Sequence, residues 1–193
     1  MGKDLKTSDL QAAATLLGVD VPTVMAVAEI ESAGAGFLPD GQVKILFEAH
    51  IFSRLTLRRY DSGYPEISAK RWDKTLYKGG AREHERLWAA VALNRDAALQ
   101  SASWGMFQIM GFNYARCGFA NVQEFVNAMV RSEGEHLQAF CRFVLSMKLD
   151  DELQRRDWAA FAAGYNGPAF AANKYDERLE RSYARFNNAT VGG

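Results

Sequence analysis

The chain has 193 residues, and its 23 lysines and arginines balance 23 aspartates and glutamates, so the formal net charge is zero. This balance argues against a protein that coats nucleic acid and against a basic membrane-surface helix, because both usually need a surplus of positive charge. With 48% hydrophobic residues and only 4 prolines, the composition excludes a disordered chain and predicts a packed core.

The first forty residues predict two helices and a turn. Residues 7–9 read Thr-Ser-Asp and open a helix that Gly18 ends. Asp20 caps a second helix with Pro22 in its first turn, and the small residues 32–36 end it. Residues 38–41, Leu-Pro-Asp-Gly, then form a turn, in which Asp40 is expected to support the backbone.

The remaining elements are mostly helical. Residues 43–48 are β-rich with apolar side chains at period two, which predicts a short strand or hairpin. Residues 53–80 are an aromatic, basic loop region with poor periodicity. Helices are expected at 82–93, around 105–109, and at 122–132, 135–147, 158–165 and 172–186. No repeat or linker divides the chain, so we expect one domain over residues 1–193.

Cysteine usage and hydropathy bear on the cellular setting. Cys117 and Cys141 lie in apolar stretches and are expected to be buried, reduced thiols, with a single disulfide as the alternative. The first residues lack an apolar signal region, and no window reaches the roughly 18 apolar residues of a membrane span. We therefore expect synthesis in the cytoplasm and no stable membrane insertion.

Glu31 is the first candidate for acid–base chemistry. On a helix it continues the apolar stripe of Val24, Val27 and Ala28, at a C-terminal position. Partial desolvation and the helix dipole should both raise the pKa of its carboxyl toward the range of a general acid. The alternative is an ordinary solvated glutamate. Glu29 points elsewhere and is expected to be a surface or structural residue.

Cleavage of a glycosidic bond would need a second carboxylate across from the first. Glu48 ends the predicted strand, where a helix followed by a hairpin can fold back toward Glu31. Its alternative role is a structural pair with His50 or a nearby arginine. The three histidines, His50, His84 and His136, lack the spacing of zinc ligands, so no metal site is expected.

Two further segments suit a polar ligand. In residues 101–111, Gly105 permits close approach of a ligand, and Gln108 offers both a donor and an acceptor to a sugar hydroxyl or acetamido group. Residues 164–168 read Gly-Tyr-Asn-Gly-Pro. Taken singly, the first segment is typical of a capped buried helix and the second of a helix end followed by a turn.

Together, segments 28–34, 45–52, 101–111 and 164–168 resemble the N-acetylmuramidase family found in endolysins of phages that infect Gram-negative bacteria. The resemblance runs from about residue 8 to residue 187. It implies a mainly α, lysozyme-like α+β fold with two helical lobes, a small β-hairpin and a cleft between the lobes. It also implies hydrolysis of the β-1,4 bond between N-acetylmuramic acid and N-acetylglucosamine, with Glu31, the glutamate before a serine, as the acid.

The same resemblance suggests the binding residues. The family pattern makes Gln108, Tyr165 and Asn166 candidates for contact with the glycan, and we add Ser103 and His50. Glu48 is the expected stabiliser or base. The implied partner is the peptidoglycan glycan strand, with no nucleic acid partner and no cofactor, and we expect a monomer.

Some features leave the reaction open. The last motif lacks the extra alanine of the common transglycosylase form, and Trp104 and Phe107 stand where small or aliphatic residues are frequent. A lytic transglycosylase and a non-catalytic glycan-binding module are therefore the alternatives. Because the first helix begins within about ten residues of Met1, we expect no separate wall-binding domain. Reaching periplasmic peptidoglycan would then require holin-type release from the host cytoplasm.

The zero net charge hides an uneven distribution. Residues 1–53 carry 3 basic and 7 acidic side chains, whereas residues 54–82 carry 8 basic and 3 acidic ones. A basic segment beside the candidate acids predicts local attraction for an anionic, peptide-bearing glycan. The residues expected to contribute are Arg58, Arg59, Lys70 and Arg71.

Overall fold

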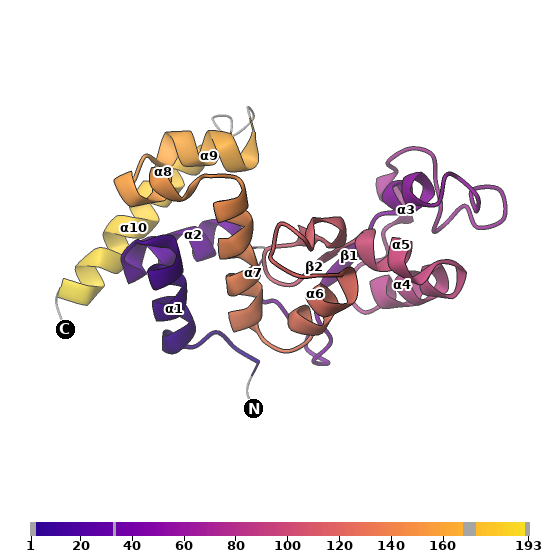
Figure 1. The fold of residues 1–193 in the computed structure, drawn as a ribbon, viewed down its shortest axis with the longest axis horizontal. Helices are drawn as coiled ribbons and strands as arrows, with labels where there is room; N and C mark the ends of the chain where they lie inside the picture. The colour runs from indigo at the N-terminus through magenta and orange to yellow at the C-terminus, as the bar shows by residue number, and fades with distance from the viewer. Residues whose placement is uncertain (1–2, 33, 168–172, 192–193) are drawn as a thin grey trace.

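The computed structural model describes residues 3–32, 34–167 and 173–191 of the chain. Its helices form two groups on either side of helix α7 (Glu133–Ser146), and the first and the last helix of the chain lie in the same group (Figure 1). One lobe holds α1 (Thr7–Leu17), α2 (Val21–Glu31), α8 (Asp150–Arg155), α9 (Trp158–Asn166) and α10 (Tyr175–Val191). The other holds the sheet with α3 (Ala49–Leu55), α4 (Arg82–Leu93), α5 (Arg95–Gln100) and α6 (Val122–Met129). The expected mainly helical, lysozyme-like arrangement is confirmed.

The helix signals near the N-terminus are confirmed. The backbone N–H of Thr23 donates to the Asp20 carboxylate at 2.9 Å, which is the predicted cap of α2. The Asp9 carboxylate accepts from the backbone N–H of Lys6 at 2.9 Å and fixes the start of α1. Gly18 ends α1 with a φ of 69°, in the left-handed region that glycine tolerates. These local bonds set the direction in which α2 delivers its last residue, Glu31.

The second lobe contains a three-stranded antiparallel sheet, in the order β1 (Ile45–Phe47), β2 (Ala102–Trp104), β3 (Ile109–Met110). The predicted strand at 43–48 is confirmed as β1. The predicted turn before it is also present: Phe37 and Val43 form a β-bridge, and the Asp40 carboxylate accepts from the backbone N–H of Gln42 at 2.9 Å. Leu46 pairs with Ser103, so β1 is held by a strand more than fifty residues away in sequence.

The helix predicted around residues 105–109 is wrong. This segment is the turn that joins β2 to β3, and Gly105 and Gln108 have φ values of 70° and 48°, which no right-handed helix allows. The ring of His136 packs so closely on Gly105 that a Cβ atom there would lie 2.8 Å from its Nδ1. The pairing of Trp104 with Ile109 and the bond from the Gly105 N–H to the carbonyl of Lys44 at 2.9 Å hold the segment as a turn, and the His136 ring leaves no room for a side chain at Gly105.

The other helix boundaries differ by a few residues from prediction. Helices α4, α6, α7 and α9 occupy the expected places, while α3, α5 and α8 are short helices that periodicity did not indicate. The helix expected at 172–186 is α10, with Ala172 outside the described residues. Of the loop region predicted at 53–80, residues 53–55 belong to α3, and residues 56–80 are irregular apart from a single 3₁₀ turn, η1 (Lys74–Leu76). A further 3₁₀ turn, η2 (Gly111–Asn113), follows β3.

The core is centred on α7. Its side chains Leu137, Phe140, Cys141 and Val144 are at most 1% exposed. Cys117 and Cys141 are both buried and free, so the expectation of reduced thiols is confirmed and the disulfide alternative is wrong. Within the described part of the chain, no single helix is long and apolar enough to cross a membrane, and α1 with α2 would pass only as a pair bent by 102°.

Candidate active site

Glu31 is the last residue of α2, and its carboxyl is partly buried against the C-terminal helices. The Asn166 side chain, at the end of α9, donates a hydrogen bond to its Oε1 at 3.1 Å. Burial raises the pKa of Glu31 above its ordinary value, while the bond from Asn166 and the positive charge of Arg178 oppose the rise. The expected direction of the pKa is thus confirmed. A carboxyl with a raised pKa retains its proton to higher pH, as a general acid requires.

Tyr165 anchors the end of α9, next to Asn166, in the core. Its ring stacks on Phe161 at 5.7 Å and meets Phe140 edge-on at 5.4 Å, so the end of α9 is anchored in the core. Burial raises the pKa of Tyr165, and the negative charge of Glu31 adds to the rise, so the hydroxyl stays protonated. The structure therefore brings together Glu31, Tyr165 and Asn166, which the sequence places more than 130 residues apart. Pro168 of the same motif lies outside the described residues.

Glu29 has a different environment, as its position on the helix predicts. Its carboxylate accepts hydrogen bonds from Ser182 and Arg185 of α10. The bond from Ser182 contributes most to holding the pKa of Glu29 below its ordinary value. Glu29 therefore fastens α2 to α10 and remains ionised, whereas Glu31, two residues later, faces a less polar surrounding.

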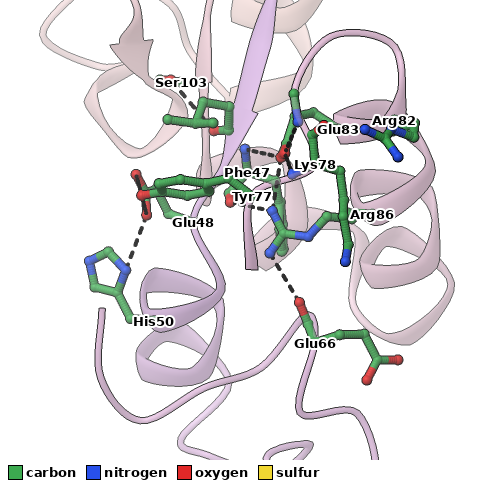
Figure 2. Close-up of polar contacts among 12 residues, drawn as sticks. Phe47, Glu48, His50, Glu66, Tyr77, Lys78, Arg82, Glu83, Arg86 and Ser103 are labelled. Atoms are coloured by element: carbon green, nitrogen blue, oxygen red, sulfur yellow. Dashed lines mark hydrogen bonds and ion pairs between the residues drawn. The ribbon is translucent and has the colours of Figure 1, made fainter. Parts of the chain in front are cut away.

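Glu48 directly follows β1, and its carboxylate contacts the side chains of Tyr77 and His50. The Tyr77 hydroxyl lies 2.8 Å and 2.9 Å from its two carboxylate oxygens, and Nδ1 of His50 lies 3.2 Å from Oε2 (Figure 2). Trp72 in turn donates its indole N–H to the Tyr77 oxygen at 2.8 Å. Burial and the bond to Glu48 raise the pKa of Tyr77, so its hydroxyl remains a donor. The contact with His50, which the sequence offered as the structural alternative for Glu48, is thus present, and the catalytic role of Glu48 stays a prediction.

Ser103 and Gln108 contact each other across the β2–β3 turn. The Ser103 hydroxyl donates to Oε1 of Gln108 at 2.9 Å, and Nε2 of Gln108 donates to the carbonyl of Gly105 at 2.8 Å. Through the pairing of Ser103 with Leu46, the turn is tied to β1 two residues before Glu48. Ser103 is buried and Gln108 partly buried, both hold the turn, and their contact with a glycan stays a prediction.

A buried ion pair that the sequence analysis missed fixes the residue before Glu48. Glu83 is 0% exposed, and its carboxylate accepts from Arg86 and from the backbone N–H groups of Phe47, Lys78 and Gly79 (Figure 2). Arg86 also donates to the carbonyl of Phe47 at 2.9 Å. Both backbone groups of Phe47 are therefore bound to this pair. The same helical stripe that drew attention to Glu31 could have found Glu83, which lies in line with the buried Leu87 and Ala90 of α4.

The histidines have separate partners. Nε2 of His84 lies 2.8 Å from the carbonyl of Val43, and Nε2 of His136 lies 2.7 Å from the carbonyl of Met129. Burial lowers the pKa of His136, and its Nδ1 accepts from the backbone N–H of Met106. No group of three metal-ligating side chains occurs among the residues that the structure describes.

Comparison with known proteins places this geometry in context. A family model described as N-acetylmuramidase matches residues 20–187. The crystal structure of the Burkholderia AP3 phage endolysin is similar, with a TM-score of 0.91 and 43% sequence identity over 97% of this chain and 73% of that chain. No curated protein matches the chain. The matched family segment contains Glu31, Glu48, Tyr165 and Asn166.

Proposed function

Because the chain belongs to the N-acetylmuramidase family, we propose that it hydrolyses the β-1,4 bond between N-acetylmuramic acid and N-acetylglucosamine in peptidoglycan, with Glu31 as the general acid. The observation that carries the proposal is the partly buried carboxyl of Glu31, which has a raised pKa and bonds Asn166. Peptidoglycan hydrolysis is the activity of this family. The bond that is cut and the residues that cut it are our assignment.

Glu31 would protonate the glycosidic oxygen as the bond to the anomeric carbon breaks. The proton passes from the carboxyl to the leaving sugar, and positive charge develops on the ring that remains. The amide of Asn166 is a donor and stabilises the glutamate anion that is left behind, which keeps the carboxyl oriented through the step. Water then completes hydrolysis and restores the proton to Glu31.

Glu48 would be the second carboxylate, as a stabiliser of the developing cation or as the base that activates water. Tyr77 and His50 hold its carboxylate in one orientation from two sides. Neither partner is a lysine or arginine, so the negative charge of Glu48 is not cancelled by a fixed cation. A carboxylate in this state can act on a cationic transition state.

The test is Glu31→Gln, with clearing of outer-membrane-stripped Gram-negative cells as the assay. The amide cannot donate a carboxyl proton, and the loss of a general acid costs about 10²–10⁴-fold in rate. Glu29→Gln is the matched control, since it changes a neighbouring carboxyl that bonds α10. Clearing by Glu31→Gln at the wild-type rate would refute the assignment.

A second substitution tests the other carboxylate. Glu48→Gln should also cause a large loss of clearing, with circular dichroism confirming an intact fold. Near-normal activity would transfer the second role to Asp40 or to no residue.

The products distinguish the two reactions open to this fold. Hydrolysis releases a reducing sugar, whereas internal attack by the muramic acid hydroxyl releases an anhydro sugar that is lighter by one water. Mass spectrometry of the released fragments should show the heavier product. We further propose that the enzyme works as a monomer without a cofactor and reaches periplasmic peptidoglycan after holin-type release.

A further inference from the structure

A groove runs along the exposed side of α3, beside Glu48. It has a volume of about 450 Å³. It is lined by His50, Ser53, Arg54, Leu57, Arg58 and Lys70. The first four recur at helical spacing, so they follow one face of α3 and the turn beyond its end. The proposed mechanism uses none of these residues except His50.

The groove has a single charge sign. Its lining includes three cations and no carboxylate. Among the described residues, no ion pair involves Arg54, Arg58 or Lys70. The guanidinium of Arg54 lies over the ring of Phe112 at 5.9 Å, which leaves its charge uncompensated. Unpaired cations around one hollow attract an anionic ligand, and the enclosing surface strengthens that attraction.

An apolar contact is built into the same rim. Leu57 and Arg58 have φ values of 53° and 63°, a left-handed conformation that is unfavourable for residues with a side chain. The turn is closed by the backbone N–H of Arg58, which donates to the carbonyl of Ser53 at 2.7 Å. It leaves Leu57 89% exposed beside the cations. The groove thus offers both charge and an apolar surface, which suits a short peptide better than a bare anion.

His50 connects the groove to the proposed active site. It lines the groove, and its Nδ1 lies 3.2 Å from the Glu48 carboxylate. A ligand in the groove would therefore lie one side chain away from Glu48. In peptidoglycan, the group closest to the scissile bond that carries both carboxylates and methyl groups is the peptide stem on the lactyl group of N-acetylmuramic acid.

We propose that this groove binds the acidic peptide stem of the substrate, with Arg58 and Lys70 facing its carboxylates and Leu57 its alanine methyl groups. The inference rests on the proposed function, because it presupposes peptidoglycan as the substrate. It adds a source of specificity: the enzyme would prefer glycan that still carries peptides over bare glycan. Of the four basic residues that the sequence analysis expected to attract the glycan, the proposal keeps Arg58 and Lys70, because Arg59 and Arg71 do not line the groove.

The test compares two double variants in a Glu31→Gln background, which prevents turnover of the ligand. Arg58→Gln/Lys70→Gln removes two cations of the groove. Arg59→Gln/Arg71→Gln removes the same charge from the same segment, and Arg59 lies over the ring of Tyr60 instead. Calorimetry measures binding of soluble, uncrosslinked peptidoglycan fragments with tetrapeptide stems. The same fragments after removal of their peptides by an amidase serve as the matched ligand.

The groove variant should bind the peptide-bearing fragments about five- to tenfold more weakly, the combined effect of two partly screened charge contacts, and the stripped fragments unchanged. The control variant should lose less than twofold. Equal loss in both variants, equal loss for both ligands, or no loss would overturn the proposal. The proposal would also be overturned if the groove variant lost binding only to phosphatidylglycerol vesicles and not to the peptidoglycan fragments, because the groove would then be a membrane-binding surface. If the parent bound neither fragment, the proposed substrate itself would be refuted, and this inference with it.

Discussion

The buried Glu83–Arg86 pair should be the most sensitive polar element of the fold, and Glu83→Gln tests it. Four donors converge on the Glu83 carboxylate: Nη1 of Arg86 at 2.8 Å and the N–H groups of Phe47, Lys78 and Gly79 at 3.1, 2.6 and 3.0 Å. An amide offers one oxygen and turns an NH₂ group toward the remaining donors. Losing a charged hydrogen bond costs about 1.5–3 kcal/mol, and an unsatisfied buried donor costs about 1–3 kcal/mol. Together these agree with the roughly 3–5 kcal/mol expected when one partner of a buried pair is removed.

Urea unfolding followed by circular dichroism measures the effect. For a chain of this size, a loss of about 3–5 kcal/mol lowers Tm by about 6–20 °C. Glu85→Gln, on an exposed position of the same helical turn, should stay within about 0.5 kcal/mol of wild type. A loss below about 1 kcal/mol in Glu83→Gln would refute the reasoning, because it would mean that water or a rearranged loop satisfies the stranded donors.

The pH dependence provides a second check on Glu83. Burial raises the pKa of its carboxyl, but the three backbone N–H groups and Arg86 outweigh burial and hold it below the ordinary 4.5. A lowered pKa contributes stability above the unfolded value, and that contribution is lost as the pH falls through the folded value. The stability gap between wild type and Glu83→Gln should therefore be full at neutral pH and shrink below about pH 4.5. A gap that stayed constant in acid would contradict the assignment.

Three further predictions follow from the site and the core. Because the pKa of Glu31 is raised above 4.5, ionisation of its carboxyl at neutral pH destabilises the folded state. Glu31→Gln should therefore have a higher Tm than wild type at pH 7 and lose that advantage in acid. Parallel curves of Tm against pH for the two proteins would contradict this. Tyr77→Phe removes the hydroxyl that donates to Glu48, so it should lower the free energy of unfolding by about 1–2 kcal/mol and slow the clearing of cells. Unchanged clearing kinetics would show that Glu48 does not need this hydrogen bond for activity. Burial raises the pKa of Cys117 and Cys141 to about 12, so a thiol reagent at pH 8 should label them only after unfolding, and rapid native labelling would be inconsistent with the packing.

The sequence was informative wherever the determining interactions are local. The Asp20 cap, the stop at Gly18 and the Asp40 turn each depend on bonds between residues two to four apart, and all three are present. The raised pKa of Glu31 was also predictable, because the helical spacing puts Glu31 on the apolar face of α2, where its carboxyl is partly desolvated. The segment at 105–109 was predicted wrongly for the complementary reason. Its apolar residues are compatible with a buried helix, and only the pairing of Trp104 with Ile109 shows that it is the turn between two strands.

Loop closure and packing decided the rest. The bond from Asn166 to Glu31 spans 135 residues, the bond from Tyr77 to Glu48 spans 29, and the bond from Phe47 to Glu83 spans 36. No periodicity or spacing reports such contacts, because each arises when separate elements pack and exclude water from polar groups that must then pair with each other. The sequence by itself determined the end of α1, the start of α2, the candidate acid and the family resemblance. The tertiary structure alone decided which distant side chains surround each glutamate, and therefore that the pKa of Glu31 is raised while the pKa values of Glu29 and Glu83 are lowered.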